Sequence, residues 1–199
     1  MPRALVTHAT LSGSTVEVAQ AVSAEIAARG WDVDCRPLQA VPDLAPYAGV
    51  VVAAPMILGW HRAALAFLRR HRAALQRRPL AVLVTGLSLT QTGDLSVPGV
   101  PVYVDERLPK PPGSAGRLTW RERYATLPNY VRPILAAARP ARPVALGVFG
   151  GRLEYGRLPW WAVLFGMVIL QAPAGDRRNW PAVRAWAASL PAAFESLPA

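Results

Sequence analysis

Hydroxyl side chains and a glycine gather near the start of the chain, in the run Thr10-Leu11-Ser12-Gly13-Ser14-Thr15. This run separates a short apolar stretch from residues 16–28, where Val18, Val22 and Ile26 recur at helical spacing. The first N–H groups of a helix lack intrahelical partners, and the helix dipole favours an anion beside them by roughly 0.3–1 kcal/mol. Hydroxyl donors, and a glycine that lets the backbone approach closely, suit the same anion. The run therefore predicts a phosphate site, with a plain capped turn between a strand and a helix as the alternative.

The sequence also indicates where the helix begins and which phosphate ligand to expect. The spacing Ser14-Thr15-Val16-Glu17 is that of a capping box and predicts that the helix begins near residue 14. The turn contains neither the Gly-x-Gly-x-x-Gly pattern of a dinucleotide fold nor the Gly-Lys-Ser/Thr end of a P-loop. The expected ligand is therefore a mononucleotide phosphate or a similar group.

The elements that must position this turn are five apolar runs of strand length: residues 3–8, 31–36, 49–54, 79–85 and 143–149. Helical patterns lie between most of them, and continuous apolar runs suit strands that are buried on both faces. The alternation predicts a doubly wound α/β fold with a parallel sheet, in a single domain spanning residues 1–199. Ligands of such folds bind at the carboxyl ends of the strands, which is where the turn at residues 10–15 lies.

Two segments interrupt the alternation. Residues 86–119 are rich in proline and glycine and predict a long loop after the fourth strand, either a functional lid or a disordered insertion. Trp160 to Leu170 form an uninterrupted apolar run, which is shorter than the ~20 residues that a bilayer-spanning helix needs. A helix that is apolar on every side must be buried against the core, a partner subunit of a homo-oligomer, or the membrane interface.

The chain is strongly basic, with 22 lysines and arginines against 12 acidic residues and a formal net charge of +10. Such a charge favours anionic partners, either anionic lipid or a substrate with carboxylates. Nucleic acid is not expected, because the densest basic run, Arg69 to Arg78, lacks interleaved aromatic residues. No residues have the spacing of metal ligands or of a catalytic nucleophile and its base. The chain lacks a signal-peptide pattern, so a cytoplasmic location is expected, including the inner face of the cell membrane.

Three segments together resemble the flavodoxin-like proteins, and within them the branch of the quinone-dependent protoporphyrinogen oxidases. The turn at residues 10–15 is similar to an FMN phosphate loop, and the run from Ala54 to His61 is similar to the second flavin loop. Residues 149–155, 175–176 and 179–187 are similar to the C-terminal signature of that branch. The resemblance implies a flavodoxin-like three-layer α/β/α sandwich around a five-stranded parallel sheet of order 2-1-3-4-5, with FMN as the cofactor.

The resemblance also implies which residues hold FMN. The phosphate would be bound by backbone N–H groups and hydroxyls of Thr10, Leu11, Ser12, Gly13, Ser14 and Thr15. The ring would lie against the loops after the third and fourth strands, formed by Pro55, Met56, Ile57, Leu58, Gly59, Trp60, Thr85, Gly86, Leu87 and Ser88. Trp60 is the candidate for stacking on the ring, with ordinary packing as the alternative. His61 is expected to cap the following helix, and His8 to be a hydrogen-bonded core residue.

The expected function is an FMN-dependent oxidoreductase that passes electrons from a tetrapyrrole substrate to a quinone. The flavin does the redox chemistry, so no separate catalytic acid–base pair is expected. The substrate's carboxylates would dock on Arg107, Lys110, Arg117 and Arg152, and Trp160 to Leu170 would make peripheral membrane contact. The alternatives are an NAD(P)H-dependent quinone or flavin reductase, an electron-transfer flavodoxin, and an assembly protein that has kept the fold without flavin.

Overall fold

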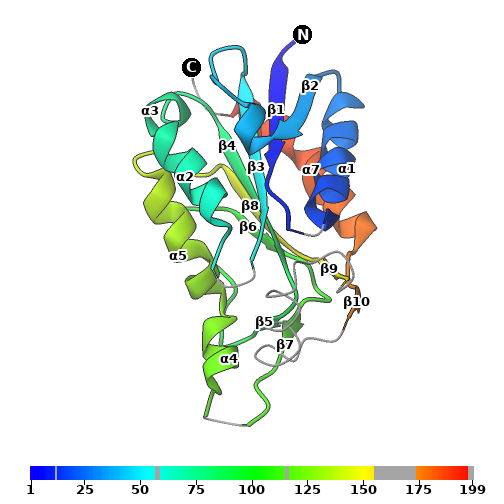
Figure 1. Ribbon diagram of the computed structural model, residues 1–199, viewed down its shortest axis with the longest axis vertical. Helices are drawn as coiled ribbons and strands as arrows, with labels where there is room; N and C mark the ends of the chain where they lie inside the picture. The colour runs from blue at the N-terminus through cyan, green and yellow to red at the C-terminus, as the bar shows by residue number, and fades with distance from the viewer. Residues whose placement is uncertain (12, 57–58, 115–116, 155–173, 197–199) are drawn as a thin grey trace.

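The centre of the computed structural model is a parallel sheet of six strands in the order β2-β1-β3-β4-β8-β6 (Figure 1). The structure describes residues 1–199 apart from residues 12, 57–58, 115–116, 155–173 and 197–199. The strands are β1 (Arg3–His8), β2 (Asp32–Pro37), β3 (Gly49–Pro55), β4 (Leu80–Gly86), β6 (Val102–Val104) and β8 (Ala145–Gly150). The predicted order of five strands is confirmed, and β6 adds a sixth strand at the edge beside β8.

Burial on both faces explains the composition of the central strands. Every residue of β3 and β4 is buried, and both strands consist mainly of small or branched apolar side chains. Side chains of a strand alternate between the two faces of the sheet, so a strand that is covered on both sides needs apolar residues throughout. The burial of both faces of the sheet explains why the sequence of these strands is continuously apolar.

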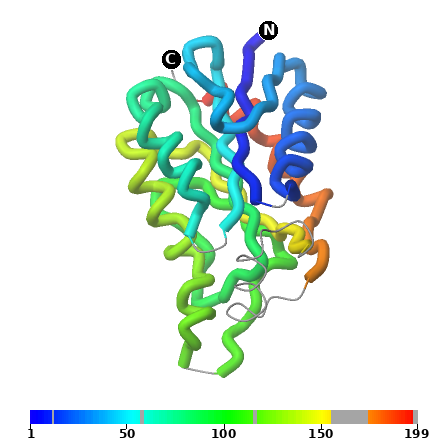
Figure 2. Tube along the Cα trace, viewed as in Figure 1, coloured from blue at the N-terminus to red at the C-terminus, as the bar shows by residue number. Residues whose placement is uncertain are grey.

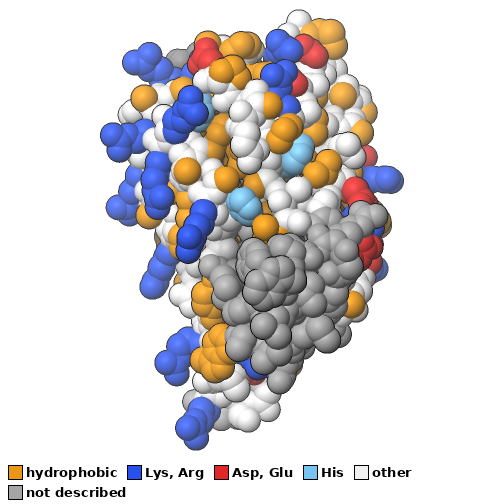
Figure 3. Space-filling view, in the orientation of Figure 1, with side chains coloured by type: hydrophobic (Ala, Val, Ile, Leu, Met, Phe, Trp, Pro, Cys, Tyr) orange, Lys and Arg blue, Asp and Glu red, His pale blue; other side chains and the backbone are white. Residues whose placement is uncertain are grey.

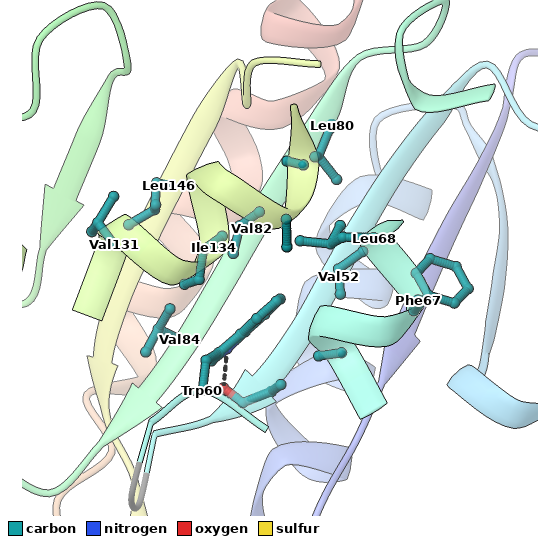
Figure 4. Close-up of a cluster of buried hydrophobic side chains, with 14 of the residues drawn as sticks. Val52, Trp60, Phe67, Leu68, Leu80, Val82, Val84, Val131, Ile134 and Leu146 are labelled. Carbon is teal, nitrogen blue, oxygen red and sulfur yellow. Dashed lines mark hydrogen bonds between the residues drawn. The ribbon is translucent and has the colours of Figure 1, made fainter. Parts of the chain in front are cut away.

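Two helical layers provide the cover. On one face, α1 (Ser14–Ala27) and α7 (Trp180–Glu195) lie side by side (Figure 1). On the other face lie α2 (Arg62–Arg70), α3 (Arg72–Leu75) and α5 (Leu127–Ala138), with α4 (Trp120–Tyr124) and the one-turn 3₁₀ helix η1 (Leu38–Ala40) beside them. Leu68 of α2 and Ile134 of α5 pack there against Val52, Val82 and Val84 of the sheet (Figure 4). The three-layer sandwich that the resemblance implied is therefore present.

The segment 86–119, which the sequence predicted to be a loop, contains three short strands in its described part. These are β5 (Leu89–Thr90), β6, and β7 (Pro109–Lys110), which pairs with β5 in a ribbon of its own. The prediction missed β6 because this strand has only three residues, which are partly exposed at the sheet edge, and it follows Pro101. Part of this insertion, in green in Figure 2, extends beyond the carboxyl ends of the central strands. It adds walls to the edge where this class of fold binds ligands.

A short antiparallel pair follows β8, made of β9 (Arg152–Leu153) and β10 (Gly175–Asp176). The apolar run from Trp160 to Leu170 falls between these two strands in sequence and lies outside the described residues, so its contact with a membrane stays a prediction. Within the described parts of the chain, no helix combines the length and the hydropathy needed to cross a bilayer.

Candidate functional site

The carboxyl ends of β1, β3, β4 and β8 meet at one edge of the sheet, and the predicted phosphate turn lies at this edge. The N–H of Met56 donates to the Thr85 carbonyl at 2.8 Å, and the N–H of Gly151 donates to the Gly86 carbonyl at 2.8 Å. A small pocket of about 30 Å³ lies between the strand ends, and the predicted site residues that line it are Leu11, Ser14, Thr15, Pro55, Met56, Thr85, Gly86 and Leu87. The structure thus brings together the loops after β1, β3 and β4, which the resemblance assigned to one site.

The phosphate turn leaves the first turn of α1 open. Gly13 precedes the helix with φ of 86°, a left-handed conformation that glycine adopts without strain, and no side chain caps the helix. The Thr10 hydroxyl accepts the N–H of Gly13 at 2.8 Å, and the N–H of Val16 donates to the Gly13 carbonyl at 3.1 Å. The N–H groups of the first turn, at Ser14 and Thr15, have no intrahelical acceptor. The predicted start of the helix at residue 14 is confirmed, and its free donors suit an anion.

The predicted capping box is wrong, because Glu17 is engaged elsewhere. Its carboxylate forms ion pairs with Arg152 at 2.8 Å and with Arg178 at 2.6 Å. Arg178 also pairs with Asp176, its side chain is only 4% exposed, and its pKa is raised chiefly by the hydrogen bond to Asp176. Glu17 therefore forms long-range ion pairs in place of the predicted contact with the start of its own helix. These ion pairs join α1 to β9 and to the segment that follows β10.

The hydroxyls of the phosphate turn differ in what they can bind. Thr15 is fully buried, and its Oγ1 lies 3.3 Å from Thr85 Oγ1, so this hydroxyl links α1 to the end of β4. Thr10 Oγ1 accepts from Gly13 but keeps its own O–H as a donor. Ser12 lies outside the described residues. Among the described residues of the turn, the available donors are therefore the first-turn N–H groups and the hydroxyls of Thr10 and Ser14.

Trp60, predicted to stack on a flavin ring, lies in the hydrophobic core. Its side chain is 2% exposed, and its indole N–H donates to the Ala54 carbonyl at 3.1 Å (Figure 4). The stacking prediction is wrong for this structure, and ordinary packing, the alternative, is found. Ile57 and Leu58 of the same loop lie outside the described residues, and Gly59 has φ of 95°.

The two predictions for histidines have different outcomes. His61 caps α2, because its Nδ1 accepts the N–H of Ala63 at 3.3 Å, which confirms the prediction. His8 is buried as predicted, and burial lowers its pKa. However, its Nδ1 has no hydrogen-bond partner among the described residues, so the predicted hydrogen bond is not found at that atom.

A larger, mostly apolar pocket of about 340 Å³ lies beside the small one and shares Met56 and Leu87 with it. Residues 87–90 form one wall, and α4 with residues 110–113 of the insertion forms the other. The Tyr130 hydroxyl donates to the Ser88 carbonyl at 2.8 Å, whereas the buried Tyr124 hydroxyl, also in this pocket, has no partner among the described residues. A pocket of this size is within the range of small-molecule sites, roughly 300–1,000 Å³.

A cationic pocket of about 340 Å³ adjoins this one, sharing Leu87 and Lys110. Arg107 and Lys110, two of the four predicted docking residues, line it together with Arg177 and Arg178. The other two predicted docking residues lie apart from it. Arg152 lines the small pocket instead and is paired with Glu17 and Glu154, and Arg117 is exposed and lines none of these three pockets.

Sequence reasoning missed Arg177 and Arg178, and the structure shows what holds them in place. A Cβ on Gly150 would lie 2.0 Å from the carbonyl oxygen of Arg177, so the chain can pass this close to β8 only because residue 150 is glycine.

Asp105 is fully buried after β6, and its Oδ1 accepts the Arg107 N–H at 3.1 Å and the Asn179 side-chain amide at 2.8 Å. The carboxylate therefore joins the insertion to the segment before α7. The signal in the sequence was the dipeptide Arg177-Arg178 directly after Asp176.

The site is better suited to an organic anion than to a metal ion. Among the described residues, no cluster of three or more His, Cys, Asp or Glu side chains is placed to hold a metal ion. The arrangement instead offers an anion site at the start of α1, an apolar pocket beside it, and a cationic pocket beyond. Such a set of sites suits a ligand with a phosphate at one end and a flat apolar group at the other.

Comparison with known proteins gives the same class of fold. A family model described as a flavodoxin domain matches residues 5–165. The Streptococcus pneumonia TIGR4 flavodoxin is 14% identical, with a TM-score of 0.51 over 96% of this chain and 98% of that one. Two-electron reduced Megasphaera elsdenii flavodoxin is 10% identical, with a TM-score of 0.50 over 98% of this chain and 99% of that one. No curated protein matches the chain.

A third alignment is partial. The Fusobacterium nucleatum flavodoxin bound to flavin mononucleotide is 14% identical, with a TM-score of 0.38 over 44% of this chain and 53% of that one, so the match spans about half of that protein. At these identities the structural likenesses show the fold alone. The family model, in contrast, covers well over half of the sequence, and on this ground the chain belongs to the flavodoxin domain family.

Proposed function

We propose that this chain binds FMN at the carboxyl edge of its sheet and transfers electrons through it. The observation that carries the proposal is the uncapped N-terminus of α1 behind Gly13, which lies next to an apolar pocket of about 340 Å³ at the same edge. Membership of the flavodoxin domain family supports it. Bound FMN would supply the redox chemistry, because a flavin takes up and returns electrons.

The residues present fit both ends of this cofactor. First-turn N–H groups of α1, with the hydroxyls of Thr10 and Ser14, would hold the phosphate. The small pocket under the turn holds about 30 Å³, roughly the volume of one water molecule. The phosphate would therefore be held at the mouth of the turn and not inside that pocket. Met56, Leu87 and the apolar walls beside them would exclude water from the ring.

The finer proposal is that the electrons come from a tetrapyrrole substrate and go to a quinone. The resemblance to protoporphyrinogen oxidases supports it, as does the cationic pocket that holds Arg107, Lys110 and Arg177 beside the apolar one. Guanidinium groups pair well with carboxylates, which a tetrapyrrole carries at its rim. Each pair of electrons and protons removed from the substrate would reduce one quinone to a quinol. The protein's task is to orient the substrate and keep the flavin edge accessible.

The test is anaerobic mixing of the FMN-loaded protein with protoporphyrinogen IX, followed by the absorbance of the flavin. We expect the flavin to be reduced by the porphyrinogen and reoxidised by a menaquinone analogue. Reduction by NAD(P)H alone would contradict the finer proposal and indicate a reductase. Reduction by neither compound, with rapid exchange with another redox protein, would indicate an electron-carrier flavodoxin. Protein that takes up no FMN would contradict the whole proposal.

A further inference from the structure

The excess positive charge of the chain is concentrated on one helical layer. Residues 44–93 and 123–153 contain no aspartate or glutamate, and these ranges include α2, α3 and α5. We call the exposed surface of these helices and of the turns after them the arginine face; its exposed arginines are Arg62, Arg69, Arg70, Arg72, Arg77, Arg132, Arg139 and Arg142. Figure 3 shows lysine and arginine side chains spread down this side of the molecule.

The arginines of this face are not neutralised by ion pairs. None of the eight belongs to an ion pair found between described residues. On the opposite layer and its edge, by contrast, Arg3 lies beside Asp32, Arg29 beside Glu25, and Arg36 beside Asp34. A surface with charges of a single sign over three helices attracts an extended anionic partner.

An exposed tryptophan stands at one end of the arginine face. Trp120, at the start of α4, is 57% exposed, and the Arg121 guanidinium lies 5.4 Å from its ring centroid. Tryptophan is enriched at the interface between membrane and water, where its ring is buried among lipids and its N–H remains hydrated. Trp120 also lines the apolar pocket of about 340 Å³. Contact at this residue would bring that pocket close to a bilayer.

A pocket lined by both arginine and apolar side chains lies at the other end of the arginine face. Arg139 and Arg142 line it together with Leu135, Val100, Pro98 and Pro140, and its volume is about 580 Å³. A phospholipid has an anionic head group, which suits the two arginines, and apolar chains, which suit the apolar residues of the pocket. A nucleic-acid strand would need several aromatic rings between the cations. Trp120 is the one large aromatic residue that is well exposed on this side, among the described residues.

We infer that the arginine face docks on the surface of an anionic lipid bilayer, with Trp120 at the interface. The inference does not depend on the flavin, because none of the eight arginines belongs to the residues assigned to FMN or to the cationic pocket. Each basic residue near an anionic membrane strengthens binding by about fivefold. Two arginines removed from this face should therefore weaken binding by about 25-fold.

The experiment is sedimentation of the full chain with vesicles of phosphatidylglycerol and phosphatidylcholine, at low and high salt, against vesicles of phosphatidylcholine alone. The test variant is Arg69→Gln with Arg132→Gln, one change on α2 and one on α5. The matched control is Arg29→Gln with Arg184→Gln, which removes the same charge from the α1–α7 layer. All four side chains are exposed or paired only at the surface, so both variants should fold, which circular dichroism checks.

We expect binding only to the anionic vesicles, weakened by salt, by about 25-fold in the test variant and little in the control. Trp120→Ser should weaken it by roughly tenfold through lost burial of the ring. Equal losses in both double variants would overturn the inference, because they would show attraction by net charge alone. Binding to neutral vesicles, or displacement from anionic vesicles by an equimolar single-stranded RNA, would overturn it as well. FMN uptake should be the same in both double variants, so failure of the flavin proposal would be seen separately.

Discussion

Replacing Gly150 with alanine would drive a methyl group into the backbone of Arg177. The added Cβ would lie 2.0 Å from the Arg177 carbonyl oxygen, whereas real Cβ atoms stay at least 3.0 Å from such neighbours. The peptide at residue 177 must therefore move by about 1 Å or more. This movement would disturb the N–H of Arg177, which donates to the Gly151 carbonyl at 3.1 Å, and its guanidinium, which donates to the Leu87 carbonyl.

The expected cost combines overpacking with a weakened hydrogen bond. Overpacking costs about 1–3 kcal/mol, and one hydrogen bond contributes about 1 kcal/mol more. A chain of this size loses about 2–4 °C of Tm for each kcal/mol, so Gly150→Ala should melt several degrees lower. The cationic pocket should also lose affinity for a carboxylate ligand, because Arg177 and Arg178 line it.

Gly151→Ala is the matched control, because its added Cβ would meet its nearest neighbour, the Gly86 carbonyl oxygen, at an ordinary 3.5 Å. Neither Gly150 nor Gly151 has the positive φ that alanine disfavours, so backbone strain does not separate the two variants. The assay is urea unfolding of both variants beside the unmodified chain. Equal stability of the two variants, whether high or low, would refute the close approach of Arg177 to β8.

Three further predictions concern the site and the core. Glu17→Gln removes a negative charge beside the start of α1 and one of the two carboxylates that pair with Arg152 and with Arg178, so FMN should bind roughly two- to fivefold more tightly at low salt. A fluorescence titration measures this, and weaker binding would contradict it. Tyr130→Phe breaks a buried hydrogen bond to Ser88 and should lower the free energy of unfolding in urea by about 1 kcal/mol. Tyr124→Phe removes a hydroxyl without a partner among the described residues and should leave the free energy of unfolding unchanged. Equal losses in the two variants would contradict this prediction. Burial lowers the pKa of each histidine, His8, His61 and His71, from 6.5. The unfolded chain therefore takes up protons first as the pH falls, and the free energy of unfolding measured in urea should decline below about pH 6.5. A flat profile from about pH 7.5 to 5.5 would refute the burial of these side chains.

Much of the fold follows from short-range patterns in the sequence. Strands buried on both faces leave continuous apolar runs, as in β3 and β4, so their positions were predictable. Their order was implied by the resemblance to flavodoxin-like proteins. The start of α1 and the meeting of three loops were predictable too, because parallel strands end at a common edge.

The parts that failed depend on contacts between distant residues. Glu17 has the spacing of a capping box, but two arginines more than 130 residues away compete for its carboxylate. Trp60 was a reasonable stacking candidate by type, yet its indole N–H donates to the Ala54 carbonyl of the preceding strand, and its ring belongs to the same core cluster as Leu68. Asp105 gave no signal, because Asn179, which donates to its carboxylate, is 74 residues away in the sequence and approaches it only in the folded chain.

The most direct test of the central claim is a titration of the purified protein with FMN and with riboflavin, followed by quenching of flavin fluorescence. If the N-terminus of α1 holds the phosphate, one FMN should bind per chain. Riboflavin, which lacks the phosphate, should bind about 100-fold more weakly, because charge-assisted hydrogen bonds contribute roughly 1.5–3 kcal/mol each. Equal affinity for the two flavins would contradict the phosphate site, and no quenching by either would contradict flavin binding altogether.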